Sequence, residues 1–260
     1  MKTVSDIMAY LETIAPKHMQ YEWDNNGMLC GRRSKEVKKI LVALDPFEEI
    51  CQEAKDWGAD LLLTHHPLIF HGPKAINDES DMGRAIMLLI KNDITAVNAH
   101  TNLDCAPGGI NDTLANCLGL TDIQIVEPKG TDVPYGLLRI GSVRQQTLGE
   151  FLAGVKENLG CEYLRYTDGG RPVNRVAVGG GSCGGEMWDA VKAGCDTFVT
   201  ADVKYNQFHD AKSIGINIID AGHFHTESPV CAVLASKIAA AFPEIEVKIS
   251  EKHGDCMKFY

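Results

Sequence analysis

The sequence has no long hydrophobic run and none of the cysteine spacings found in disulfide-rich or zinc-ribbon proteins. No stretch of 18 apolar residues is present, which excludes a membrane-spanning helix by length. The nine cysteines include no Cys-x-x-Cys pair, so we expect reduced, mostly buried thiols. The N-terminal residues contain no apolar signal core. Together these absences predict a soluble cytoplasmic protein with no membrane partner.

Positive charge is also scarce. The 25 Lys and Arg residues are outnumbered by 35 Asp and Glu residues, which gives a net charge of −10. Such a balance argues against a surface that coats a nucleic acid, so a nucleic-acid partner is not expected. An anionic small-molecule substrate would need local positive charge, which bound metal ions can supply. With 260 residues, of which 45% are hydrophobic, the chain can bury two ordinary cores.

Short apolar strands alternate with helices along the chain, a pattern typical of an α/β fold with a parallel or mixed sheet. Thr3 is expected to cap the first helix, Thr147 and Glu150 to form a capping box, and Ser228 to cap the last helix. The expected strands are residues 40–44, 61–64, 94–99, 135–140, 161–166, 176–178, 197–200, 216–220 and 244–249.

The two halves of the chain resemble each other. A shift of 136 positions places residues 39–64 over 175–200 without a gap, so that Val42 meets Val178. We therefore expect two similar α/β lobes. Residues 127–134 are rich in Gly, Pro and charge and are interpreted as a linker, which gives lobes of residues 1–127 and 128–260.

Six of the nine histidines follow three predicted strands, and two carboxylates come close behind them. In open α/β sheets, ligands bind beyond the carboxyl ends of the strands, so a site is expected there. The histidines are His65, His66, His71, His100, His223 and His225, and the carboxylates are Asp104 and Glu227.

The adjacent pair His65-His66 favours two metal ions over one. Neighbouring side chains in extended backbone point to opposite sides, so two adjacent imidazoles suit two ions lying side by side. Pro67 stiffens this presentation. Three histidines with two carboxylates are too many for one tetrahedral ion that leaves a position open for substrate. Asp104 and Glu227 are the candidate bridging ligands.

The remaining candidates carry weaker signals. His100 is placed to act as a general acid/base or to support a ligand, whereas His71 and His225 have ordinary surface or turn roles as alternatives. The glycine-rich run 179–185 follows a strand and precedes a helix, which suits either approach to a phosphate or tight packing. Cys183 within this run is a candidate thiol without an evident base.

Several motifs resemble the NIF3-like proteins, also called the GTP cyclohydrolase 1 type 2 homologue family, nearly from end to end. The resemblance implies a dinuclear metal site in the cleft between two α/β lobes, two divalent ions per chain (Zn, Fe or Mn) and a toroidal homohexamer. The ligands it implies are His65, His66, Asp104, His223 and Glu227. The motifs are Trp23-Asp24-Asn25-Asn26-Gly27, Thr64-His65-His66-Pro67-Leu68-Ile69-Phe70, His100-Thr101-Asn102-Leu103-Asp104, Thr200-Ala201-Asp202-Val203-Lys204-Tyr205 and Asp220-Ala221-Gly222-His223-Phe224-His225-Thr226-Glu227.

The expected function is that of a dinuclear metal-dependent hydrolase, GTP cyclohydrolase 1 type 2-like, acting on a nucleotide or another phosphate-bearing small molecule. His100 would move protons and Lys204 would steady negative charge. The alternative is a non-enzymatic metal-binding scaffold or regulatory protein. Two positions depart from the family's pattern, which often has Gly at the position of Ala201 and His at that of Asn206.

Overall fold

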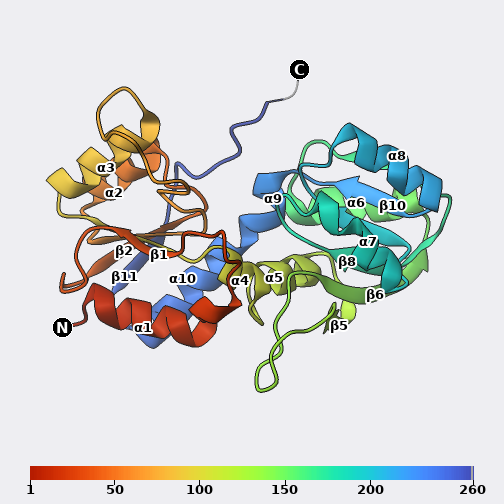
Figure 1. The fold of residues 1–260 in the computed structure, drawn as a ribbon, viewed down its shortest axis with the longest axis horizontal. Coiled ribbons are helices and arrows are strands. Elements are labelled where there is room, and N and C mark those ends of the chain that lie inside the picture. The colour runs from red at the N-terminus through yellow and green to blue at the C-terminus, as the bar shows by residue number, and fades with distance from the viewer. Residues whose placement is uncertain (259) are drawn as a thin grey trace. The chain divides into compact units, whose positions relative to one another are not determined.

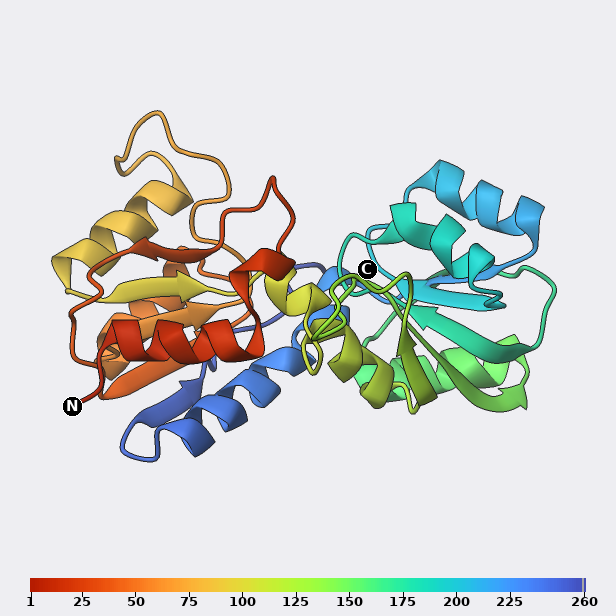
Figure 2. The same cartoon turned by 60° about the horizontal axis from the view of Figure 1, so that its bottom comes forward.

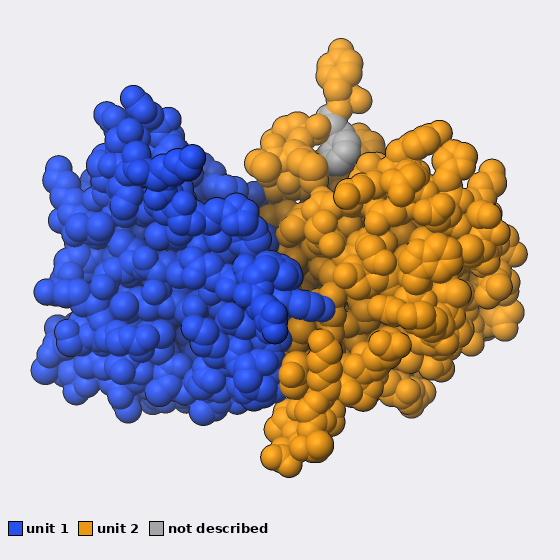
Figure 3. Space-filling model, in the orientation of Figure 1, with its two compact units in different colours: residues 1–103, 230–254 blue, residues 104–229, 255–260 orange. Residues whose placement is uncertain are grey.

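The computed structural model describes residues 1–258 and 260. The chain forms two compact units, coloured separately in Figure 3. Unit 1 comprises residues 1–103 and 230–254, and unit 2 comprises residues 104–229 and 255–260. No helix in the described part of the chain is long and apolar enough to cross a membrane.

These units differ from the lobes of residues 1–127 and 128–260 suggested by the sequence. Residues 127–134, interpreted there as a linker, lie inside unit 2. Lys129 and Tyr135 exchange two backbone hydrogen bonds at 2.8 and 2.9 Å, which closes this segment into a hairpin-like loop. A Gly- and Pro-rich composition marks a loop equally well whether it joins two lobes or two strands of one sheet.

Unit 1 is a mixed sheet with helices on both faces (Figures 1 and 2). Its strand order is β1-β4-β3-β2-β11; β1 is antiparallel to β4, and the other neighbours are parallel. Helices α2 and α3 cover one face, and α1 and α10 cover the other. The strands are β1 (Gly27–Cys30), β2 (Lys39–Ala43), β3 (Leu61–Thr64), β4 (Thr95–Asn98) and β11 (Glu246–Ile249). The helices are α1 (Val4–Ile14), α2 (Glu48–Trp57), α3 (Asp81–Lys91) and α10 (Pro229–Ala241).

Alternating side chains of the central strands build the core of unit 1. Leu41 of β2 and Leu62 of β3 pack in a buried cluster with Ile50 of α2 and Ile86 of α3. Helix α1 begins at the expected residue, because Thr3 and Asp6 form a capping box. The parallel strands are held in register, so the residues that follow β2, β3 and β4 emerge at one edge of the sheet.

Unit 2 has the strand order β5-β6-β8-β9-β10-β7. Strands β8, β9 and β10 are parallel, and β5, β6 and β7 each pair antiparallel with a neighbour. The strands are β5 (Thr121–Ile125), β6 (Arg139–Gln146), β7 (Arg165–Thr167), β8 (Val173–Val178), β9 (Thr197–Thr200) and β10 (Asn217–Asp220). The helices are α5 (Ile110–Cys117), α6 (Leu148–Leu159), α7 (Met187–Lys192), α8 (Tyr205–Ile214) and the short α9 (His223–Glu227), and the boundary between the units falls inside α4 (Thr101–Cys105).

Two apolar clusters lie on opposite faces of the unit 2 sheet. Val178 of β8 packs with Phe151 of α6 on one face. Phe198 of β9 packs with Met187 of α7 on the other. The predicted capping box of Thr147 with Glu150 is present at the start of α6. Ser228, in contrast, does not cap the last helix: it has α-helical backbone angles, and its N–H bonds to the carbonyl of Phe224 at 2.8 Å, because α9 runs directly into α10.

The strand–helix–strand segments β2-α2-β3 and β8-α7-β9 have the same parallel strand pairing and register. Val42 pairs with Leu63 across β2 and β3, and Val178 pairs with Val199 across β8 and β9. The second pair lies 136 positions after the first, as the sequence repeat requires. The two sheets share this parallel core and differ in the strands added beyond it.

The turn that precedes the second strand of each segment is also equivalent. The Asp60 carboxylate accepts hydrogen bonds from the N–H of Lys39 and of the residue before it, at 3.1 and 2.8 Å. The Asp196 carboxylate accepts from the N–H of Arg175 and of the residue before it, at 2.7 and 3.1 Å. The repeat therefore extends to side-chain hydrogen bonds, and the two lobes are similar as predicted.

Candidate metal centre

Three histidines meet where β3 and β4 of unit 1 end. His65 and His66 follow β3 directly, and His100 follows β4 by two residues. Each of the three offers a ligand atom, and these atoms lie within 4.8 Å of one another. Thr64 and Asn98, the last residues of β3 and β4, are paired in the parallel sheet, so the two strands end at the same position. This pairing explains why the three histidines that follow lie close together. We call these three side chains the histidine cluster; it can hold a metal ion.

The ring orientation of the first two histidines is set by acceptors of the same unit. His65 Nδ1 lies 2.9 Å from the carbonyl oxygen of Ala99. His66 Nδ1 lies 2.6 Å from Oδ1 of Asp45. A carbonyl or carboxylate oxygen only accepts, so Nδ1 carries the proton and Nε2 the lone pair in the neutral ring. This is the arrangement that metal-ligating histidines generally have.

His100 has the same kind of support from Asp24, which is buried. Asp24 Oδ1 lies 2.7 Å from His100 Nδ1. Its other oxygen accepts from the Thr101 N–H at 3.0 Å and the Thr101 hydroxyl at 2.5 Å. Burial alone would raise the pKa of Asp24, but the hydrogen bonds from His100 and Thr101 lower it below its ordinary value. Asp24 therefore stays ionised and holds the His100 ring in place.

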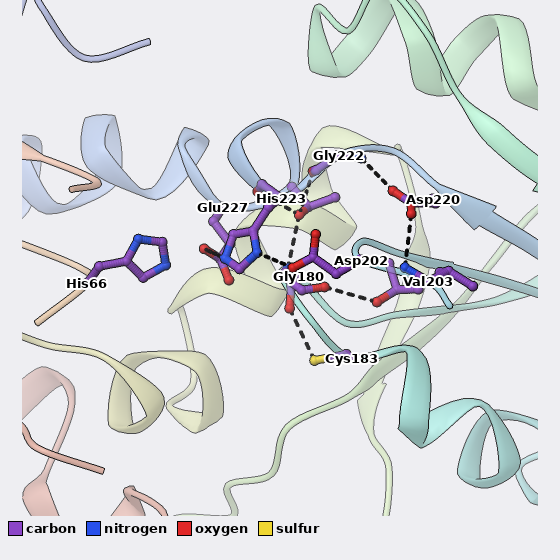
Figure 4. Close-up of polar contacts among 12 residues, drawn as sticks. His66, Gly180, Cys183, Asp202, Val203, Asp220, Gly222, His223 and Glu227 are labelled. Atoms are coloured by element: carbon purple, nitrogen blue, oxygen red, sulfur yellow. Dashed lines mark hydrogen bonds and ion pairs between the residues drawn. The ribbon is translucent and has the colours of Figure 1, made fainter. Parts of the chain in front are cut away.

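In unit 2, His223 lies between two carboxylates (Figure 4). Its Nδ1 is 2.7 Å from Asp202 Oδ2, and its Nε2 is 2.9 Å from Oε2 of Glu227, one helical turn further along α9. Burial alone would lower the pKa of His223, but its contacts with Asp202 and Glu227 raise that pKa to about 11. A metal ion at Nε2 would take the place of the proton that Glu227 now accepts.

Asp104 belongs to unit 2 and is buried. Burial raises the pKa of Cys183 well above its ordinary value, and the negative charges of Asp104, Glu186 and Glu227 raise it further. The Cys183 thiol also donates to the carbonyl of Gly180 at 3.1 Å. The thiol considered from the sequence is therefore a buried structural group in this setting. Glu227 lies directly against Gly180 and Gly181. Asn111 links the backbone at Asp104 to the glycine-rich run, because it donates to the carbonyl of Asp104 at 3.2 Å and accepts from the N–H of Gly180 at 2.7 Å.

The glycine-rich run packs against the protein's own side chains. The N–H of Gly180 donates to Asn111 Oδ1 at 2.7 Å, and the N–H of Gly181 donates to Thr226 Oγ1 at 3.0 Å. Gly181 has a φ of +63°, and a β-carbon there would collide with Oε1 of Glu227. Of the two roles left open by the sequence, packing is the one that applies to Gly180 and Gly181.

The five predicted ligands are divided between the units, and the weaker candidate His100 lies with two of them in the histidine cluster. Two ligands, His65 and His66, belong to unit 1, and three belong to unit 2. His225 Nδ1 lies 3.3 Å from the carbonyl of Leu159 and its Nε2 3.4 Å from Asp255, which accounts for both ring nitrogens.

His71 is exposed and packs on Phe70, with ring centroids 4.6 Å apart. Lys204 is exposed and begins α8 as its N-cap. These contacts give His71 a packing partner and Lys204 a place at the start of α8.

Two carboxylates were not assigned a role from the sequence. Asp45 follows the end of β2 by two residues, so the strand-end rule that selected the histidines could have found it. Asp24 stands in the motif Trp23-Asp24-Asn25-Asn26-Gly27, but its partner His100 is 76 residues away. Only the tertiary fold pairs such distant residues.

The fold and these side chains define an α/β protein whose clustered histidines and carboxylates can bind metal ions. The profile of the Duf34/NIF3 family (NGG1p interacting factor 3) matches residues 2–255. The chain belongs to this family, as the motifs suggested.

Curated relatives and solved structures agree with this membership. The chain is 38% identical to the GTP cyclohydrolase 1 type 2 homolog of Clostridium perfringens, over 98% of this chain and 99% of the relative. It is 33% identical to the protein of the same name from Clostridium acetobutylicum, over 98% of each. A crystal structure of a Staphylococcus aureus protein matches with a TM-score of 0.92 at 29% identity, covering 100% of this chain and 99% of that one. Reduced HcgD from Methanocaldococcus jannaschii matches with a TM-score of 0.82 at 26% identity, covering 96% and 98%.

Proposed function

We propose that this protein is a metal-dependent hydrolase that binds two divalent ions and acts on a nucleotide or another phosphate-bearing small molecule. The observation that carries the proposal is the fixed orientation of its histidines. In His65, His66 and His223, an acceptor of the same unit holds Nδ1 and directs Nε2 to ligation. The proposed ligands are His65, His66, Asp104, His223 and Glu227.

The chemistry of these donors fits the ions proposed. Imidazole nitrogens and carboxylate oxygens suit Zn, Fe or Mn, and the buried Cys183 stays protonated and does not compete. The side chains that hold the Nδ1 atoms of His66 and His223 are carboxylates, which raise the basicity of the ligating nitrogens. The three histidine ligands therefore have the supporting contacts that metal-ligating histidines usually have.

Bound ions would act as Lewis acids and lower the pKa of water at the site. The protein's own contribution to proton transfer is His100. Because Asp24 accepts from Nδ1, Nε2 of the neutral ring can take up a proton, and Asp24 then stabilises the imidazolium. Lys204 is proposed to steady negative charge on a phosphate.

The test is a turnover screen of metal-loaded protein against GTP, other nucleotides and simple phosphoesters. GTP comes first because relatives carry the name GTP cyclohydrolase 1 type 2 homolog. Activity should vanish with a chelator, return with added metal and be absent from the Asp104→Ala protein at matched concentration. Turnover that survives complete metal removal would contradict the proposal.

The alternative of a non-enzymatic scaffold makes different demands. In a scaffold, metal removal would lower the melting temperature or break the assembly, and no substrate would turn over at any metal loading.

The homohexamer implied by the family resemblance remains part of the proposal. Sedimentation of the metal-loaded and metal-free protein tests it, and a monomer in both states would contradict it.

A further inference from the structure

Two exposed aromatic side chains lie together in unit 1. Trp23 is 60% exposed and Phe70 is 42% exposed. Their ring centroids are 5.9 Å apart, and the rings meet at 64°. Side chains of this size usually bury their rings, and exposed aromatic pairs mark binding surfaces.

The Trp23 ring is held firmly in spite of its exposure. Tyr21 stacks on it with centroids 5.6 Å apart and an interplanar angle of 12°. The Tyr21 N–H donates to Thr101 Oγ1 at 3.1 Å, and the Asp24 N–H donates to the Tyr21 carbonyl at 3.0 Å. With Tyr21 stacked against one face of the indole and 60% of the side chain exposed, the opposite face is the side on which a ligand ring can stack.

The loop that carries Phe70 is tied to the loop that carries Trp23. Asn25 donates from Nδ2 to the carbonyl of Ile69 at 2.6 Å. This bond joins the residue next to Phe70 to the turn that begins at Trp23. The two loops are therefore joined before any ligand arrives, which reduces the entropy lost in ordering them on binding.

These rings border the histidine cluster. The His100 ring centroid is 6.3 Å from that of Trp23 and 6.1 Å from that of Phe70, and both meetings are nearly edge-on. A flat molecule stacked on Trp23 would therefore lie next to the histidine cluster. His65 and His66 complete the cluster, with ring centroids 5.1 and 5.7 Å from that of His100.

We infer that Trp23 is a stacking platform for the planar heteroaromatic ring of the substrate, with Phe70 as its side wall. The inference rests on the proposed function and narrows the substrate class to phosphate-bearing compounds that carry a planar heteroaromatic ring. Simple sugar phosphates have no such ring and are therefore outside this class. Any nucleobase has a π-face that stacks on an aromatic side chain. The identity of the base is left to other contacts.

Binding can be measured without turnover through tryptophan emission. Metal-loaded protein is titrated with guanosine 5′-monophosphate and, separately, with ribose 5-phosphate, which has the phosphate but no ring. The nucleotide should quench the emission, and ribose 5-phosphate should not. In calorimetric titrations, Trp23→Leu should weaken nucleotide binding by about 10- to 100-fold without changing metal content or ribose 5-phosphate binding.

A matched control is available, because Trp188 in α7 is 49% exposed and belongs to unit 2. Trp188→Leu should keep the full nucleotide affinity. Undiminished binding by Trp23→Leu, absence of nucleotide binding, or equal affinity for both compounds would overturn the inference. Acrylamide should quench the emission of Trp23 in the ligand-free protein, because the ring is exposed in a single chain. If acrylamide does not quench it, another chain covers the ring, and the inference is overturned. Metal content and turnover, measured separately, report on the proposed function alone.

Discussion

The Cα of Gly181 lies so close to Oε1 of Glu227 that the protein has no room for a β-carbon between them. The same β-carbon would lie 3.1 Å from Nε2 of His223. A glycine is required here on a second ground, because its φ of +63° strains any residue with a β-carbon. The backbone of the glycine-rich run thus lies directly against two proposed ligands and leaves room for their side chains.

Gly181→Ala should therefore lower both stability and metal content. The left-handed backbone alone costs about 1–2 kcal/mol, and the collision moves Glu227 away from its present position. Elemental analysis and thermal unfolding measure the two effects. Gly185→Ala is the control, because a β-carbon at Gly185 meets nothing within 4 Å. Equal metal content in the two variants would show that Gly181 does not position a ligand.

Removal of the carboxylate behind His223 should weaken metal binding without unfolding the protein. Asp202→Ala deletes the acceptor at 2.7 Å from Nδ1, so the ring loses its fixed orientation. The loss of metal affinity should be about 10- to 100-fold, measured by competition with a chelating dye. Asp210→Ala, at an exposed position of α8, should leave the affinity unchanged. An unchanged affinity in the Asp202 variant would show that Asp202 does not support a metal ligand.

His100 and Asp104 have separable roles under the proposal. His100→Ala should keep both metal ions and lose turnover by about 10²–10⁴-fold, because it removes the proton acceptor and leaves the five ligands intact. Asp104→Asn keeps the size of the side chain but removes its charge, so metal content itself should fall. Both variants are assayed for metal and for turnover. Because His100 lies within 4.8 Å of His65 and His66 at its ligand atom, a fall in metal content in His100→Ala would reassign it as a ligand.

The Glu53 carboxylate should make the stability of unit 1 depend on pH. It accepts from the backbone N–H of Glu251 at 2.9 Å and of Lys252 at 3.2 Å, and also from the Ser250 hydroxyl. Burial alone would raise the pKa of Glu53, but these hydrogen bonds hold it below its ordinary value of 4.5. The ionised form is thus favoured in the folded state.

For a lowered pKa, the stabilisation is complete above pH 4.5 and is lost as the pH falls through the folded-state value. The free energy of unfolding of the wild type should therefore exceed that of Glu53→Gln at pH 6, and the difference should shrink below about pH 4.5. Denaturant unfolding at a series of pH values measures it. A difference that is constant from pH 6 to pH 3 would show that the Glu53 charge does not contribute.

The buried strands were predictable because their apolar runs are short, continuous and bounded by turn residues. The strands at 61–64 and 197–200 have the predicted limits. In contrast, β1 and β5 were missed. Most residues of both strands are only partly buried or exposed, the apolar residues of β1 are only Met28, Leu29 and Cys30 after a glycine, and β5 has no continuous apolar run. Edge strands owe their pairing to a neighbour that is remote in sequence, so their own residues carry little signal.

The site shows the same division. Strand-end placement was sufficient to find His65, His66 and His100, which the structure brings together. The supports behind them could not be assigned, because the pairs Asp45–His66 and Asp24–His100 join residues 21 and 76 positions apart. Which nitrogen of each ring is directed to a ligand depends on those supports, and therefore only on the folded chain.

The equivalent turns at Asp60 and Asp196 lead into strands β3 and β9, and the residues that follow these two strands have different roles at the candidate metal centre. After β3 the chain presents His66, and 136 positions later, after β9, it presents Asp202, whose carboxylate orients the ring of His223. One copy of the repeat thus supplies the imidazole of His66, a proposed ligand. The other copy supplies the carboxylate of Asp202, which orients the imidazole of a different proposed ligand, His223. When a chain contains the same strand–helix–strand segment twice, the side chain at one strand end can change while the equivalent side chain in the other segment keeps its role. The repeat in this chain therefore permits the two strand ends to specialise. Substitution of His66 should remove a proposed ligand, whereas substitution of Asp202 should only weaken the orientation of one.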